Sequence, residues 1–168
     1  MSVSREREAF DNSQVEKEVV DTDGFLRRIR LLLPNPCKIF YPGSGDDTFL
    51  EPVFGREEIY YLDKDETCLT GYAPNFSAGR YDEVSYMDDF WDAIVYKDSH
   101  MPLEAFIRML RAVRVGGLVI RENFTCDDEF TPDEMRLIPG LRELSLSYEV
   151  NSHWKLLVFE KVPPSQTL

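Results

Sequence analysis

The stretch Ile39-Phe40-Tyr41-Pro42-Gly43-Ser44-Gly45 decides the fold class of this chain. Its apolar part predicts a short strand over residues 37–41, and the glycines predict a tight turn directly after it. Because glycine has no Cβ, the backbone of such a turn can approach a ligand closely, and a following helix would offer free N–H groups. A plain structural turn has the same pattern, so the turn alone does not establish a ligand site.

The next informative residue along the chain is Asp63. A buried strand is expected over residues 59–62, and Asp63 closes it 18 residues after Gly45. A carboxylate at this place and spacing can accept hydrogen bonds from both hydroxyls of a ribose. The alternative interpretation is a surface carboxylate that merely ends a strand.

Strands and helices alternate on both sides of these residues. Apolar spacing predicts a helix that begins at Asp21 or Thr22 and stops before Pro34, and a second helix that Pro102 opens and Gly116-Gly117 ends. The segment 46–54 contains Pro52, so a helix there should be brief or distorted. Further strands are expected over residues 81–86, 92–96 and 118–120.

The C-terminal third of the chain predicts a short helix and a closing hairpin. Thr131 and Glu134 have the spacing of a capping box, and residues 144–150 and 154–159 form two strands joined at Asn151-Ser152. The whole pattern predicts an α/β fold, with a mostly parallel Rossmann-like sheet, an antiparallel C-terminal strand and helices on both faces. We expect a charged N-terminal segment (1–20), one domain (21–162) and a frayed tail (163–168).

Composition narrows the class of protein and its partners. The 168 residues carry a formal net charge of −12, which argues against nucleic acid as a partner, and the basic run at residues 27–30 is typical of a solvated helix face. Three scattered cysteines form neither a disulfide framework nor a metal site and favour a reducing cytoplasm. No apolar run is long enough for a signal peptide or a membrane span. We therefore expect a cytoplasmic protein with no metal and no membrane contact.

In their order along the chain, these elements resemble the class I S-adenosylmethionine-dependent methyltransferases. The matching elements cover roughly residues 37–161, and they are Tyr41-Pro42-Gly43-Ser44-Gly45, Asp63, Trp91-Asp92-Ala93-Ile94, Val113-Arg114-Val115-Gly116-Gly117 and the final hairpin. The resemblance implies S-adenosylmethionine as cofactor and transfer of its methyl group to a small-molecule or protein acceptor that the sequence does not identify. The cofactor-binding residues that it implies are Tyr41, Gly43, Ser44, Gly45, Asp63, Lys64 and Asp88.

The sequence departs from the family pattern at several positions. Tyr41 stands where the first strand usually ends in an acidic residue, and Asp47 replaces the third glycine. The segment between Asp63 and Asp92 is short for the usual helix, strand and helix. Lys97-Asp98-Ser99-His100 replaces the Asn-Pro-Pro-Tyr tetrad after the fourth strand.

Several functional interpretations stay open. Asp98 and His100 are candidates for a general base if the acceptor must lose a proton, although a surface-loop histidine would look the same. A methyltransferase-like binding or regulatory module without catalysis is the alternative to an enzyme, and a protein partner or a second copy could complete the acceptor pocket. A nicotinamide-binding Rossmann domain fits less well because Thr48 occupies the place of its third glycine. An acidic mimic of nucleic acid is a weaker interpretation still.

Overall fold

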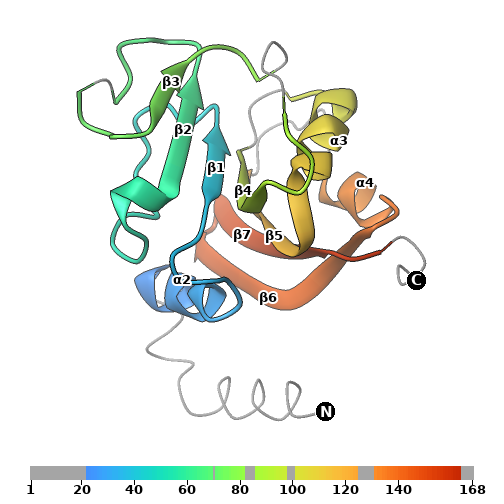
Figure 1. Ribbon diagram of the computed structural model, residues 1–168. Helices are drawn as coiled ribbons and strands as arrows, with labels where there is room; N and C mark the ends of the chain where they lie inside the picture. The colour runs from blue at the N-terminus through green and yellow to red at the C-terminus, as the bar shows by residue number, and fades with distance from the viewer. Residues whose placement is uncertain (1–21, 70, 82–85, 98–100, 125–130, 164–168) are drawn as a thin grey trace.

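The computed structural model describes residues 22–69, 71–81, 86–97, 101–124 and 131–163. These residues form a seven-stranded sheet with the order β3-β2-β1-β4-β5-β7-β6 (Figure 1). β3, β2, β1, β4 and β5 run parallel, whereas β7 is antiparallel to β5 and to β6. The predicted mostly parallel sheet with antiparallel C-terminal strands is confirmed. The expected N-terminal segment 1–20 and all of the expected tail 163–168 except Pro163 lie outside the described residues.

The elements have the following bounds. The strands are β1 (Ile39–Pro42), β2 (Ile59–Asp63), β3 (Phe76–Ala78), β4 (Trp91–Lys97), β5 (Val113–Phe124), β6 (Leu141–Asn151) and β7 (Trp154–Lys161); the helices are α2 (Thr22–Arg30), the 3-10 turn η1 (Arg56–Glu58), α3 (Leu103–Ala112) and α4 (Pro132–Arg136). None of the described helices is both long and apolar enough to span a bilayer.

Helices cover both faces of the sheet, because successive side chains of each strand point to opposite faces. On one face, Ile39 and Tyr41 of β1 belong to a core with Leu26 and Ile29 of α2. On the other face, Phe40 belongs to a core that contains the apolar stripe of α3 and Met135 of α4. The two cores are separated by β1, β4, β5 and β7, which are therefore buried on both sides, and this explains their continuous apolar runs.

A buried carboxylate joins α2, β1 and the start of β2. Glu58 accepts hydrogen bonds from the backbone N–H of Cys37 (2.7 Å) and of Gly55 (2.9 Å), and from the guanidinium of Arg30 (3.1 Å). Although burial raises it, these hydrogen bonds together hold the pKa of Glu58 below its usual range. Glu58 therefore ties three segments at the amino edge of the sheet, opposite the glycine turn.

Turns replace a helix in the crossover between β1 and β2. Phe54 N donates to Leu50 O at 2.9 Å, but no α-helix forms between Gly43 and Gly55. Pro52 lacks a backbone N–H, which agrees with the predicted distortion. Leu50 and Phe54 are fully buried and occupy the place over the sheet that a helix would otherwise cover.

Two boundaries differ from the expectation. α3 ends at Ala112, before Gly116-Gly117, because β5 begins at once at Val113 and runs through both glycines. The third strand is β3 at Phe76–Ala78, whereas the expected strand over residues 81–86 falls mostly on residues that lie outside the described part of the chain.

Gly117 provides a test of the β4–β5 contact. A Cβ at Gly117 would lie 2.7 Å from the backbone oxygen of Asp92 and 2.6 Å from Val113 Cγ1. Gly117→Ala should therefore lower the free energy of unfolding by about 1 to 3 kcal/mol, the usual cost of overpacking. Val115→Ala, on the same strand but 53% exposed, is the control and should cost less than about 0.5 kcal/mol. Equal urea midpoints for the two variants would contradict this packing.

Candidate functional site

The glycine turn lies at the carboxyl end of β1, where the order of the parallel strands reverses. Gly43 and Gly45 have φ values of 64° and 57°, in the left-handed region that favours glycine. Gly43 N donates to Leu62 O at 2.7 Å, and Gly45 N donates to Asp63 Oδ2 at 2.8 Å. The structure therefore brings the turn and Asp63 together, at the sheet edge where α/β folds bind their ligands.

The space beside Gly45 is open. A Cβ built on Gly45 would meet no atom of the described chain within 4 Å. Packing within the protein therefore does not require glycine at this position. The left-handed backbone conformation favours glycine, and the absence of a side chain leaves the space open. This is the arrangement that a close approach of a ligand to the backbone would need.

Asp63 is fixed by the backbone through both carboxylate oxygens. Oδ2 accepts from Gly45 N, and Oδ1 accepts from Asp65 N at 2.9 Å. An ionised carboxylate offers about four acceptor positions, so both oxygens can accept a further hydroxyl hydrogen. The side chain is partly exposed and is held in one orientation before any ligand arrives.

Next to the turn lies a cluster that the buried Tyr41 and Glu122 form with the partly exposed Asp47. The Tyr41 hydroxyl donates to Asp47 Oδ2 at 2.9 Å and also contacts Glu122 Oε1 at the end of β5. Asp47 Oδ1 accepts from Phe49 N at 3.1 Å, so the residue at the third glycine position holds the turn by its carboxylate. Lys97, the register partner of Glu122 on β4, donates to Ser44 O at 3.3 Å.

Burial and charge change the proton affinity of this cluster. Tyr41 and Glu122 have no exposed surface. Burial, and then the charge of Asp47, raise the pKa of Glu122 to about 8, although the Tyr41 hydrogen bond and the charge of Lys97 oppose this. Burial, and then the charge of Glu122, raise the pKa of Tyr41 well above its usual value. Burial and the neighbouring carboxylate thus favour the neutral form of Glu122.

Two hollows lie near the sheet, and they differ in character. A shallow one of about 520 Å³, lined by Glu66, Thr67, Phe76 and Ala78, adjoins the carboxyl ends of β2 and β3, where Ala78 is the register partner of Asp63.

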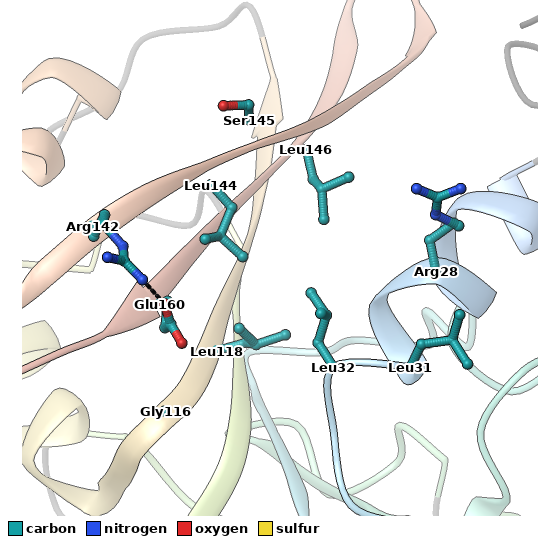
Figure 2. A pocket seen from close by; sticks show the side chains of 10 residues that line it. All are labelled: Arg28, Leu31, Leu32, Gly116, Leu118, Arg142, Leu144, Ser145, Leu146 and Glu160. Atoms are coloured by element: carbon teal, nitrogen blue, oxygen red, sulfur yellow. Dashed lines mark hydrogen bonds and ion pairs between the residues drawn. The ribbon is translucent and has the colours of Figure 1, made fainter. Parts of the chain in front are cut away.

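The other hollow, of about 640 Å³, lies between α2 and β6 (Figure 2). Leu31 and Leu32, which directly follow α2, and Leu144 and Leu146 of β6 line it, and the Arg142–Glu160 ion pair lies at its side. It is on the α2 face at the amino-terminal part of β5, away from the glycine turn.

The remaining predicted site residues are placed as follows. Ser44 is buried within the turn, and Lys64 is exposed directly after Asp63. Asp88 does not join them: it is exposed and precedes β4, at the amino edge, where the neighbouring Asp89 N donates to Arg111 O. Asp98 and His100 lie outside the described residues. No group of three or more His, Cys, Asp or Glu side chains that could hold a metal ion is found in the described part of the chain.

Sequence reasoning missed Lys97 as a site residue and Glu122 altogether. In the sequence, Lys97 stands only as part of the stretch that replaces the tetrad. Glu122 follows the apolar run of residues 118–120, where a charged residue normally indicates that a strand has reached solvent. The available signal was the alternation within β5, because Glu122 has the same parity as Leu118 and Ile120, which face the α2-side core.

Comparisons with known proteins address the fold. No protein-family model matches this sequence, and no curated protein matches it. Solved structures do match it over most of their length. An rRNA methylase from Streptococcus thermophilus is 16% identical, with a TM-score of 0.59 and coverage of 84% of this chain and 94% of that one. A TehB-like SAM-dependent methyltransferase from Corynebacterium glutamicum is 16% identical, with a TM-score of 0.58 and coverage of 95% and 96%.

A third match was solved with ligands bound. The 1,6-didemethyltoxoflavin-N1-methyltransferase of Burkholderia thailandensis, with bound 1,6-didemethyltoxoflavin and S-adenosylhomocysteine, is 15% identical, with a TM-score of 0.62 and coverage of 95% and 86%. The chain thus has the fold of the class I methyltransferases. At these identities the likeness establishes the fold alone, since one fold hosts many functions.

The buried carboxyl of Glu122 provides a pH-dependent test. The folded protein keeps this proton up to about pH 8, whereas an unperturbed glutamate loses it near pH 4.5, so the stability of the fold falls as the pH rises between these values. Glu122→Gln cannot ionise, and its stability advantage over the parent should grow by up to about 1.4 kcal/mol per pH unit in this range. Urea unfolding at pH 5, 7 and 8.5 measures it. An advantage that does not grow with pH, or one matched by Glu149→Gln at an exposed position of β6, would contradict the burial of an ionisable group here.

Proposed function

We propose that this methyltransferase-fold chain binds S-adenosylmethionine at the carboxyl edge of its sheet and transfers the methyl group to an acceptor. One observation carries the proposal: Gly45 N donates to Asp63 Oδ2 at the reversal of strand order, with open space beside the glycine. A turn that leaves room for a ligand and an oriented carboxylate one strand away are the two features that nucleoside binding requires.

Each part of the cofactor has a place in this arrangement. Both oxygens of Asp63 can accept ribose hydroxyls, and the backbone at Lys64 flanks the same position. The adenine would lie over the hollow beside Asp63, where the partly buried ring of Phe76 offers an apolar surface. The methionine part would then extend past Gly43, Ser44 and Gly45 toward the cluster around Tyr41. Asp88, at the opposite edge, is not part of this proposal.

Methyl transfer requires little of the protein beyond the positioning of the acceptor and the cofactor. The acceptor atom attacks the methyl carbon in line with the departing sulfur, so positioning and exclusion of water supply most of the rate enhancement. An acceptor that must lose a proton would need a base. Asp47, the partly exposed carboxylate of the cluster, is the candidate for this role. We also propose a cytoplasmic location, which the thiol of Cys37, not joined in a disulfide, supports.

A binding module without catalysis is a second candidate, and one observation favours it. The turn after β1 is not followed by a helix, so the free N–H groups of a helix N-terminus are not available to the ligand there. In that case the space beside Gly45 and Asp63 would hold a cofactor or its product for regulation. Binding is common to both candidates, so binding is tested first.

Replacement of Asp63 tests the proposed cofactor site. Asp63→Ala should weaken the binding of S-adenosylmethionine and S-adenosylhomocysteine about tenfold or more, because charge-assisted hydrogen bonds to the ribose are lost. Gly45→Val should weaken both more strongly, since its φ of 57° is strained for valine and the side chain fills the open space. Titration calorimetry measures both affinities.

The matched control is Asp88→Ala, an exposed aspartate at the other edge, which should bind both ligands as the parent does. Thermal unfolding confirms that the variants are folded. The proposal is wrong if the parent shows no binding heat and no thermal shift at millimolar ligand, or if Asp88→Ala is as weak as Asp63→Ala.

A further inference from the structure

The hydrogen-bond contacts around Tyr41 call for a proton on one of the two neighbouring carboxyls when no ligand is bound. The Tyr41 oxygen is in hydrogen-bond contact with Asp47 Oδ2 and Glu122 Oε1, but a phenol has a single hydrogen to donate. If both carboxyls were ionised, one contact would join two oxygens without a hydrogen between them. A neutral Glu122 removes this conflict, because it donates to the Tyr41 oxygen while Tyr41 donates to Asp47.

The surroundings decide which carboxyl is neutral. Asp47 is 26% exposed and lies 3.9 Å from Lys97 Nζ, so it is the better place for a negative charge. Glu122 is fully buried, and its Oε2 has no hydrogen-bond partner among the described residues. β4 contributes Lys97 opposite Glu122, and β7 contributes the uncharged Leu156. Arg121 points to the other face, where its guanidinium lies over the Tyr96 ring.

Glu122 is thus a buried carboxyl close to the glycine turn, and its Oε2 makes no hydrogen bond within the described residues. A positive charge nearby would favour its ionised form. An opposite charge within about 4 to 6 Å favours the ionised form of a carboxyl, and in a buried site this effect acts without direct contact. The four residues of β1 are all uncharged, so β1 brings no negative charge to this end of the turn. Glu122, from β5, is the buried group there that can supply one when it ionises.

We infer that Glu122 is the charge-recognition group of the site, which ionises when a sulfonium cation binds beside the glycine turn and regains its proton when the sulfur becomes a neutral thioether. The inference rests on the proposed function and names the group that distinguishes cofactor from product. A sulfonium carries no N–H or O–H group, so its positive charge is the main electrostatic feature by which a site can recognise it against a thioether.

The proton balance of the two steps is complete. When the cation binds, the Glu122 carboxyl loses one proton, which leaves through Tyr41 and the partly exposed Asp47 to solvent. Methyl transfer would form the acceptor–carbon bond and break the carbon–sulfur bond, with the electron pair left on sulfur and the positive charge passed to the acceptor. The acceptor would then lose one proton, and Glu122 would take up one proton, from the acceptor or from solvent, once the site holds the thioether alone. Glu122 would therefore favour the cofactor over its product more strongly than an uncharged side chain would.

Calorimetry of the full chain counts this proton directly. Titrations of S-adenosylmethionine and S-adenosylhomocysteine at pH 7, each in phosphate and in Tris, give the protons released from the difference in apparent heat between buffers. The parent should release up to one proton more with the sulfonium than with the thioether. Its affinity for the sulfonium should rise by up to tenfold per pH unit as the pH approaches about 8 and level off above, while the affinity for the thioether should not follow this rise.

Glu122→Gln is the decisive variant, because it keeps the shape of the side chain and cannot ionise. The amino group of the ligand also titrates near this range, but it does so equally with parent and variant. The extra proton and the extra pH dependence should both disappear in the variant, and its preference for sulfonium over thioether at pH 8.5 should fall about tenfold or more. Glu149→Gln should behave as the parent does.

The outcomes separate this inference from the proposed function. If both ligands bind the parent with the same proton release, the inference is wrong and the cofactor site stands; the parent alone decides this, even if the variant is unstable. If the extra proton persists in folded Glu122→Gln, another group recognises the charge and the inference is equally wrong. If neither ligand binds the parent, the proposed function fails and the inference falls with it.

Discussion

The hydrogen bond from Gly45 N to Asp63 Oδ2 is the constraint on which the site depends. It joins the turn after β1 to the end of β2, and each neighbouring group takes its place relative to that turn. Tyr41 precedes it, Asp47 follows it, and Lys97 reaches its carbonyl at Ser44. The parallel pairing of β1 with β2 and β4 brings these groups to one edge of the sheet, because parallel strands end on the same side.

The chain achieves this geometry without the crossover helix that a doubly wound sheet usually has between β1 and β2. Buried side chains in turns, chiefly Leu50 and Phe54, cover the sheet where a crossover helix is absent. Glu58 closes the opposite edge by binding α2, the segment before β1 and the turn before β2. The consequence for function is a turn held by side-chain carboxylates, where a helix N-terminus would otherwise support it. Electrostatics at the site thus depend on Asp47, Asp63 and Glu122 together.

Sequence reasoning succeeded where a local pattern reflects the physical cause. β1, β2, β4, β5 and the hairpin are short apolar or alternating runs between turn residues, and Gly43, Gly45 and Asp63 follow two of them directly. It failed where the cause is a contact across the sheet. The burial of Glu122 depends on its pairing with Lys97 and Leu156, and the position of Asp88 depends on where β4 begins. Likewise, β5 starts before Gly116-Gly117 because Gly117 lies against the Asp92 carbonyl, which the sequence of neither segment reveals.

The most direct test of the account follows the amide signals of the glycines in a heteronuclear NMR titration with S-adenosylhomocysteine. The sequence has nine glycines, and the neutral product avoids any complication from the sulfonium charge. The account predicts that the amides of Gly43 and Gly45 shift progressively and saturate, while those of Gly116 and Gly140, in other parts of the sheet, stay in place. Unchanged signals for Gly43 and Gly45 at millimolar ligand, or saturable shifts confined to Gly116 beside the α2–β6 hollow, would contradict it.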